Sequence, residues 1–327
     1  MSLTILGAGS VGLTLAARLA RGGVRVLVLT RREAAAHALS AGLVAEHPAD
    51  GTCFEVELDA RCADHPETWP DQPVLLCTRG DGVEAAAKLV ARRAPQAPLV
   101  TFQNDVVHEA TAARYHSTVL GGVWRETCTR TGDARVRFLH DRPSRAIVGL
   151  HPSGHSQDAH AIAALLERGD IRSGVSECVT LDKWLKLCVN LMSTPNALIR
   201  REDHAGRDFV EIKVSLLEEA RAVLAAAAIE TGSCDGLDRS LDEEIAFQRA
   251  SLERGTSARP IPLYNQVWSA LTRRLPTEAD AYHRRICDLG ERHDVTTPLN
   301  RRVLEALLHA ARTHTGPESL AASNLRA

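Results

Sequence analysis

The chain has 327 residues, of which 44% are hydrophobic and 24% charged, with a formal net charge of -2. This composition is typical of a soluble globular protein with room for two domains, and it gives no electrostatic reason to bind nucleic acid or an anionic membrane surface. The eight cysteines form no Cys-x-x-Cys pair, which favours reduced thiols in a cytoplasmic protein. We expect neither a signal peptide nor a membrane span.

The N-terminal stretch predicts a strand, a glycine-rich turn and a helix in direct succession. An apolar strand over 3–6 leads into Gly-x-Gly-x-x-Gly, and an amphipathic helix and a second apolar strand follow. Gly9 lets the backbone approach a pyrophosphate closely, and the helix N-terminus offers N–H groups and partial positive charge to phosphates. An ordinary glycine turn is the alternative. The sequence predicts a dinucleotide site at Gly7, Ala8, Gly9, Ser10, Val11 and Gly12.

Strand and helix patterns alternate to about residue 176. Strands are predicted over 24–29, 54–58, 74–78, 98–102, 119–124, 135–139 and 145–150, and helices over 34–42, 84–93, from Asp105 as N-cap, and over 158–168. Such alternation predicts a doubly wound parallel sheet, in which ligands bind beyond the carboxyl ends of the strands. The strand ends at Gly7, Arg79 and Gln103-Asn104 should therefore lie along one edge.

Helical patterns replace strand patterns from about residue 177. Helices are predicted over 182–200, 209–231, 241–254, 263–275, 277–294 and 300–313, with a frayed tail after Gly316. We therefore expect an N-terminal Rossmann-type domain over 1–176 and an all-helical domain over 177–327, which would bind the substrate and is compatible with a homodimer.

The residues at the end of the second strand should decide whether the site prefers NAD or NADP. An acidic residue there would accept hydrogen bonds from the ribose 2′-hydroxyl of NAD, but this chain has Thr30-Arg31-Arg32. A guanidinium can pair with a 2′-phosphate, so NADPH is favoured and Arg31 is its predicted contact. A solvated loop is the alternative for these arginines. Arg79 is a second candidate for a phosphate or ribose contact, and an ordinary surface position is equally consistent with it.

One helical stretch places polar residues beside core positions. Lys186 and Asn190 are four residues apart and share a face, and Lys183 lies close to it. The apolar face consists of Leu185, Cys188, Val189 and Met192. A charged lysine beside a core is costly without a partner, which makes Lys186 a candidate proton donor. A lysine that reaches water along the helix surface is the alternative.

Four motifs, in this order, resemble the ketopantoate reductases (2-dehydropantoate 2-reductases). They are the glycine motif, Gln103-Asn104, Trp184-Leu-Lys186-Leu-x-x-Asn190 and Thr277-Glu278-Ala-Asp280. The resemblance covers nearly the whole chain. It implies a Rossmann domain, a helical domain and the NADPH-dependent reduction of a small 2-keto acid to a 2-hydroxy acid, as in pantothenate biosynthesis.

The resemblance also implies roles for individual residues. Lys186 would be the general acid that protonates the developing alkoxide, and Glu278 would hydrogen-bond the substrate hydroxyl. Asn104 would lie at the nicotinamide ribose and the substrate, with Asn190 beside Lys186. Arg31 would contact the NADPH phosphate.

Four positions depart from the family pattern. Asp105 replaces a glycine, Thr194 and His283 each replace an asparagine, and Gln266 replaces a serine that helps bind the substrate carboxylate. Thr194 and Gln266 are thus expected beside the substrate together with Asn104 and Asn190. Because changed hydrogen-bonding groups alter which substrate is accepted, ketopantoate, another carbonyl or an imine all stay open, as does a non-catalytic NADP(H) sensor.

Three histidines, His151, His155 and His160, lie close together in the sequence. Only Asp158 stands among them as a further ligand, so we expect no metal site there. The cofactor prediction is therefore NADPH alone.

Overall fold

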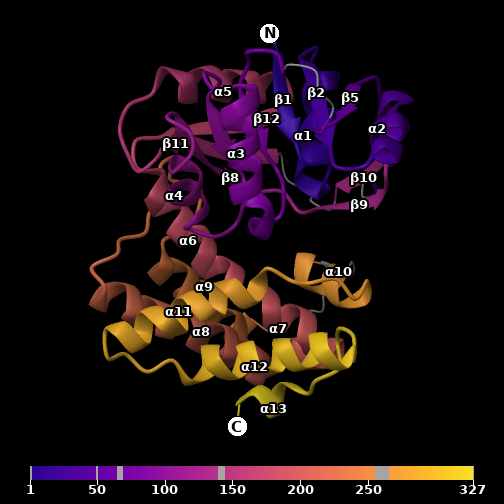
Figure 1. Ribbon diagram of the computed structural model, residues 1–327. Helices are drawn as coiled ribbons and strands as arrows, with labels where there is room; N and C mark the ends of the chain where they lie inside the picture. The colour runs from indigo at the N-terminus through magenta and orange to yellow at the C-terminus, as the bar shows by residue number, and fades with distance from the viewer. Residues whose placement is uncertain (1, 49–50, 65–68, 139–143, 255–264, 327) are drawn as a thin grey trace. The chain divides into compact units, whose positions relative to one another are not determined.

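The computed structural model describes residues 2–48, 51–64, 69–138, 144–254 and 265–326. The chain divides into two compact units, Met1–Lys183 and Trp184–Ala327. The division falls inside helix α6 (Val179–Leu191), whereas the sequence placed a domain boundary between residues 176 and 177. Figure 1 shows both units and labels most of their helices and several of their strands.

The first unit is built on an eight-stranded sheet with the order β12-β11-β8-β7-β6-β1-β2-β5. Its strands are β1 (Ser2–Leu6), β2 (Arg25–Thr30), β5 (Asp59–Cys62), β6 (Val74–Leu76), β7 (Leu99–Thr101), β8 (Val119–Trp124), β11 (Ser144–Leu150) and β12 (Ile171–Ser176). Neighbouring strands are parallel except for β8 and β11, so β11 and β12 run against the others. The predicted doubly wound sheet is confirmed, with a reversed pair at one edge.

Helices cover both faces of this sheet, which explains its continuous apolar strands. They are α1 (Ser10–Arg21), α2 (Glu33–Ser40), α3 (Val83–Arg93), α4 (His108–Ala113) and α5 (Gln157–Arg168), with a short 3-10 turn at Gly80–Gly82. Leu3 and Ile5 of β1 pack in the core that contains α1 and α5. Leu6, on the opposite face, packs in the core that contains α3 and α4.

A second, four-stranded sheet packs against α1. Its order is β4-β3-β10-β9, with β3 (Leu43–His47), β4 (Thr52–Val56), β9 (Cys128–Gly132) and β10 (Arg135–Phe138). Val136 and Phe138 of β10 are buried in the core formed with α1. The sequence expected this strand, together with the one over 145–150, to close the first domain. It pairs with β3 and β9 in the smaller sheet of the first unit, and residue 139 lies outside the described residues.

The second unit is helical, as predicted. After α6 it contains α7 (Ser193–Leu198), a 3-10 turn at Arg201–Ala205, α8 (Arg207–Ala226), α9 (Leu241–Arg254), α10 (Gln266–Thr272), α11 (Ala279–Arg292), α12 (Pro298–Thr313) and α13 (Ala322–Arg326). The helix predicted over 182–200 is divided near Met192, and Pro195 lies in the first turn of α7, where its missing N–H is tolerated. The start of the helix predicted over 263–275 lies outside the described residues.

The C-terminal tail is ordered against the second unit, so the prediction of a frayed end is wrong. Leu320 forms a bridge with Ile199, and Ala322 and Leu325 are 4% and 2% exposed. Arg326 forms ion pairs with Asp208 and Glu211. A helix this short gives too few apolar repeats to be recognised in the sequence.

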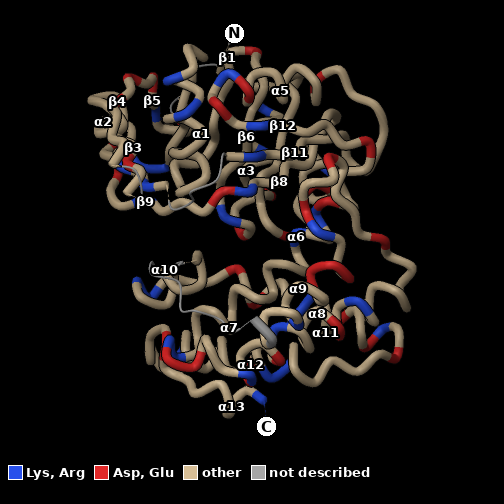
Figure 2. The backbone as a smooth tube through the Cα atoms, turned by 180° about the vertical axis from the view of Figure 1, so that it is seen from behind, with Lys and Arg blue, Asp and Glu red and all other residues tan. Residues whose placement is uncertain are grey.

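Charges of both signs are interspersed along the backbone of each unit (Figure 2). This distribution agrees with the small net charge of the chain. Within the described ranges, no helix joins the length and the apolar character that crossing a bilayer would require.

Candidate active site

The turn after β1 contains three glycines, and the space that a Cβ would find differs at each of them. Gly7 has φ of +117°, and a Cβ there would lie 2.7 Å from the carbonyl carbon of Cys77. A Cβ at Gly12 would collide with the carbonyl oxygen of Gly7. Among the residues that the structure describes, a Cβ at Gly9 would meet only the carbonyl oxygen of Cys77, at 3.6 Å, which is ordinary contact. Gly9 therefore leaves open a surface that the packing of the described residues does not fill.

The ends of β1, β6 and β7 lie side by side, as the sequence predicted. Leu6 is paired in register with Leu76, and Leu76 with Thr101. Gln103, which follows β7, donates through its Nε2 to the carbonyl oxygens of Leu76 at 3.0 Å and Thr78 at 2.9 Å. The glycine turn and the Gln103-Asn104 turn therefore follow nearby strands at one edge of the sheet.

Asn104 is half-buried at this edge, and Asp105 is 4% exposed. Asp105 does not cap the next helix, so that prediction is wrong. Helix α4 begins at His108 with Val107 as its N-cap. The Asp105 carboxylate instead accepts a hydrogen bond from the backbone N–H of Val106 at 2.7 Å, because a short acidic side chain readily bonds its own turn.

The two arginines after β2 differ in their surroundings. Arg32 forms an ion pair with Asp133, from the turn between β9 and β10. Arg31 is exposed, and its guanidinium makes no hydrogen bond or ion pair with the residues that the structure describes. Arg79 lies 3.5 Å from Asp81 in the turn after β6. Arg31 is thus the cation of this group that is best placed to meet an external anion.

Arg130, which no pattern in the sequence indicates, also borders the glycine turn. Its backbone N–H donates to Ser10 Oγ at 3.0 Å, and its Nη1 donates to the carbonyl oxygen of Ala8 at 3.4 Å. Asp133 lies 3.7 Å from the same guanidinium. More than a hundred residues separate Arg130 from this turn, so only the packing of the second sheet on α1 brings them together.

The sequence also gave no role to Lys183, whose side chain is 4% exposed. Its ammonium forms an ion pair with Glu109 of α4, which is 2% exposed, and donates to the carbonyl oxygen of Gln103 at 2.8 Å. A lysine near the polar face of an amphipathic helix is ordinarily read as a surface charge. Here it is a buried part of the Gln103 turn.

Lys186 and Asn190 lie on α6, one turn apart. Both are half-buried. Of the predicted apolar face, Leu185, Cys188 and Met192 are buried, and Val189 is half-buried. Three of the four residues of the predicted apolar face are thus buried, while Val189 is half-buried, as Lys186 and Asn190 are.

Glu278 and Gln266 contact each other within the second unit. Gln266 Nε2 donates to Glu278 Oε2 at 2.9 Å, and Glu278 is the N-cap residue of α11, at the helix start expected there. Asn265 fixes Gln266 locally, because its Oδ1 caps α10 at Trp268 N and its Nδ2 donates to the carbonyl oxygen of Ser193 at 2.6 Å. The amide of Gln266, an exposed residue, is therefore a hydrogen-bond partner of the Glu278 carboxylate.

Thr194 and His283, two departures from the family pattern, contact each other. Both are fully buried, and Thr194 Oγ1 lies 2.9 Å from His283 Nε2. Asn300 Nδ2 donates to Glu219, so Asn300 Oδ1 accepts from His283 Nδ1 at 2.9 Å. Nε2 of the neutral ring must then accept, and the Thr194 hydroxyl donates to it. A direct bond from this hydroxyl to a substrate would require that contact to break.

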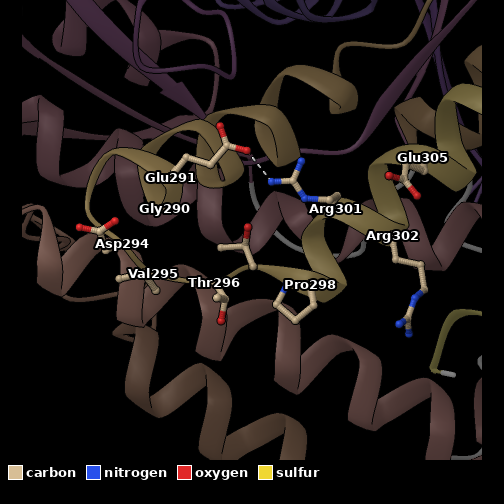
Figure 3. A pocket seen from close by; sticks show the side chains of 10 residues that line it. Gly290, Glu291, Asp294, Val295, Thr296, Pro298, Arg301, Arg302 and Glu305 are labelled. Carbon is tan, nitrogen blue, oxygen red and sulfur yellow. Dashed lines mark hydrogen bonds and ion pairs between the residues drawn. The ribbon is translucent and has the colours of Figure 1, made fainter.

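A pocket of about 660 Å³ in the second unit lies elsewhere, between the end of α11 and the start of α12 (Figure 3). The ion pair of Glu291 with Arg301 crosses it, at 2.5 Å. Its lining residues are Gly290, Glu291, Asp294, Val295, Thr296, Thr297, Pro298, Arg301, Arg302 and Glu305, which include none of the predicted site residues. Among the residues described, no cluster of three or more His, Cys, Asp or Glu could hold a metal ion.

The sequence matches two family models that together span most of both units. They are "Ketopantoate reductase PanE/ApbA" over residues 3–152 and "Ketopantoate reductase PanE/ApbA C terminal" over residues 179–311. A 2-dehydropantoate 2-reductase from Pyrococcus abyssi (strain GE5 / Orsay) is 22% identical over 307 residues, which are 92% of this chain and 94% of the relative.

Solved structures share the fold. A PanE/ApbA family ketopantoate reductase from Ralstonia eutropha JMP134 matches with a TM-score of 0.74 at 19% identity, covering 96% of this chain and 100% of that chain. A D-mandelate dehydrogenase solved with NADH and anilino(oxo)acetate matches with a TM-score of 0.77 at 17% identity, with the same coverage.

The burial of His283 predicts a dependence of stability on pH. Burial lowers the pKa of His283 from 6.5 to about 4, although its hydrogen bond to Asn300 opposes the shift. The unfolded chain therefore takes up this proton first, and we expect the free energy of unfolding to fall by about 3 kcal/mol from this group as the pH drops from 6.5 to 4.

Urea denaturation of the parent and of His283→Asn at several pH values measures this contribution. The difference in unfolding free energy between the two proteins should shrink as the pH falls, because the variant lacks the group. His293→Asn, at an exposed histidine, is the matched control and should follow the parent. A parent and a His283→Asn variant with parallel pH profiles would contradict a neutral buried imidazole.

Proposed function

Because the chain belongs to the ketopantoate reductase family, we propose that it is an NADPH-dependent reductase of a 2-keto acid, with ketopantoate as the first substrate to test. The observation that carries the proposal is the glycine turn, where Gly9 keeps an open surface at the N-terminus of α1. The residues retained on α6 and at the start of α11 support the chemistry, since a protein that only senses a dinucleotide needs neither Lys186 nor Glu278.

The residues present fit a nicotinamide dinucleotide. The N–H groups at the start of α1 and the missing Cβ of Gly9 suit a pyrophosphate. The exposed guanidinium of Arg31 suits a 2′-phosphate, and the half-buried amide of Asn104 suits the nicotinamide ribose and the substrate. NADPH, when bound, supplies the hydride that reduces the ketone. Arg79 remains a secondary candidate for a phosphate or ribose contact.

The proton would come from Lys186. Its ammonium stabilises negative charge on the ketone oxygen and transfers one proton from Nζ to that oxygen as the alkoxide forms. Asn190, one turn later on the same face, would help to hold this ammonium. Glu278, a hydrogen-bond partner of Gln266, would accept a hydrogen bond from the hydroxyl of the product.

Gln266 and Thr194 would then act on the substrate mainly through other side chains. Gln266 donates to Glu278, and the Thr194 hydroxyl is engaged with His283. The replacement of the substrate-binding serine and asparagine of the family would therefore change how neighbouring side chains of the site are held, rather than a direct contact with the substrate. A substrate panel should include ketopantoate and aryl 2-keto acids, with NADPH oxidation as the measurement.

Replacing Lys186 should remove the proton donor. We expect Lys186→Ala to lower kcat about 100- to 10,000-fold, while the affinity for NADPH, measured by fluorescence titration, stays within about twofold. Lys88→Ala, at a surface lysine paired with Glu84, is the control and should keep full turnover. Unchanged turnover in Lys186→Ala would refute its role.

Replacing Arg31 should separate the two dinucleotides. Loss of a charge-assisted contact to the 2′-phosphate should weaken NADPH about 10- to 100-fold and leave NADH nearly unchanged, as measured by equilibrium titration. Arg32→Ala is the neighbouring control, because Arg32 is already paired with Asp133. Equal weakening of NADPH and NADH by Arg31→Ala would rule out the phosphate contact.

Replacing Gly9 should affect the ligand and spare the fold. Gly9 has φ of -83°, which alanine adopts readily, so Gly9→Ala should change stability by no more than about 0.5 kcal/mol. The added methyl group should greatly reduce the rise in Tm on adding NADPH or NADH. Gly12→Ala is the contrast, because its Cβ collides with Gly7 and should lower Tm without ligand. A full ligand-induced rise in Gly9→Ala would exclude a dinucleotide from this surface.

A further inference from the structure

A buried polar cluster lies directly under the Gln103 turn of the first unit. Lys183 and Glu109 are 4% and 2% exposed and form an ion pair. Lys183 Nζ also donates to the carbonyl oxygen of Gln103 at 2.8 Å, and the hydroxyl of Thr101 donates to Glu109. The cluster therefore joins the end of β7, the turn after it, α4 and α6.

Stability alone does not account for this cluster. Taking two charges out of water is costly, and apolar side chains of similar volume often hold a core at least as firmly as a buried ion pair does. An ammonium adds direction, because its N–H groups must point at particular oxygens. One of those oxygens belongs to the main chain of Gln103, in the turn that leads to Asn104.

The packing around the cluster leaves little freedom to move. A Cβ at Gly121 of β8 would lie 2.9 Å from Val179 and 3.4 Å from Cγ of Glu109. A Cβ at Gly149 of β11 would lie 3.0 Å from Val179 and would collide with the carbonyl oxygen of Ser176. The first turn of α6 thus lies directly on the backbone of two strands, which fixes the origin of the Lys183 side chain.

Gln103 is held from two sides as a result. Its side-chain amide donates to the carbonyl oxygens at the end of β6, and its own carbonyl oxygen accepts from Lys183. Asn104, the next residue, has no side-chain hydrogen bond to the part of the chain that the structure describes. A fixed main chain and an available amide are what a ligand-binding residue requires.

We infer that Lys183, paired with Glu109, is a positioning residue that fixes the main chain of Gln103 so that the amide of Asn104 meets the nicotinamide half of the cofactor. The inference rests on the proposed function and assigns Lys183 no contact with the cofactor or the substrate. It separates the two lysines of α6, because Lys186 would transfer the proton while Lys183 sets the geometry.

The test compares the whole cofactor with its adenosine half. The double variant Lys183→Met/Glu109→Gln removes both charges without leaving either one buried alone, and glutamine can still accept from Thr101. We expect it to bind 2′,5′-ADP within about twofold of the parent. Its affinity for NADPH should fall about three- to tenfold, and kcat should fall about tenfold or more. Lys183→Arg, which keeps a donor, should recover part of both losses.

A second ion pair of the same unit provides the matched control. Arg18 and Glu126 are 15% and 0% exposed, lie 2.8 Å apart, and are accompanied by Ser144, whose hydroxyl donates to Glu126 at 2.7 Å. Arg18→Met/Glu126→Gln removes a comparable pair at the far end of α1. We expect it to lower Tm while the ratio of NADPH affinity to 2′,5′-ADP affinity stays at the parent value.

The outcomes are separable. The inference is overturned if the Lys183 double variant binds and turns over like the parent, or if NADPH and 2′,5′-ADP weaken equally, which would show a structural role only. A parent that binds NADPH but reduces no 2-keto acid defeats the proposed function, and the affinity ratio then still decides the inference. A parent that binds no dinucleotide defeats both.

Discussion

A close backbone contact between the turn after β1 and the end of β6 constrains the first unit. With φ of +117° and a would-be Cβ 2.7 Å from the carbonyl carbon of Cys77, Gly7 must be glycine if β1 and β6 are to end together. Once these strands are fixed, β7 follows in register, and Gln103 closes the edge by donating to the carbonyl oxygens of Leu76 and Thr78. The edge of the sheet at the ends of β1, β6 and β7 therefore depends on the close packing at Gly7 and on the two hydrogen bonds that Gln103 donates.

Both units place buried polar groups close to a predicted functional residue. In the first, Lys183 and Glu109 support the turn that precedes Asn104. In the second, His283 and Asn300 hold Thr194 of α7. Apolar side chains would fill the same volume, but they would not fix the direction of a main chain or a hydroxyl. In each unit, hydrogen bonds therefore fix the orientation of a main-chain or side-chain group, which hydrophobic packing alone would leave free to turn.

The sequence predicted features that depend on neighbouring residues and missed those that depend on distant ones. The strands β1, β6 and β8 and the glycine turn were recognisable because their apolar runs and glycine spacing are local. Strand β12 (Ile171–Ser176) was missed, since half-exposed residues interrupt its apolar pattern. Lys183 gave no signal, because its partner Glu109 is far away in the sequence. The prediction that Asp105 caps the next helix was wrong. An acidic residue before a helix can either cap the helix or hydrogen-bond its own turn, and the sequence does not distinguish the two.

Three of the residues that depart from the family pattern, Thr194, His283 and Gln266, form hydrogen bonds within the second unit. His283 donates from Nδ1 to Asn300, so its Nε2 needs a donor, and Thr194 supplies one. An apolar residue at 194 would leave that nitrogen buried and unsatisfied, at a cost of about 1–3 kcal/mol. The two changes therefore support each other and form one structural unit. Gln266 likewise bonds Glu278. On the proposed function, a difference in substrate choice would arise from how this chain holds Glu278 and α7, because Thr194 is already bonded to His283 and Gln266 to Glu278.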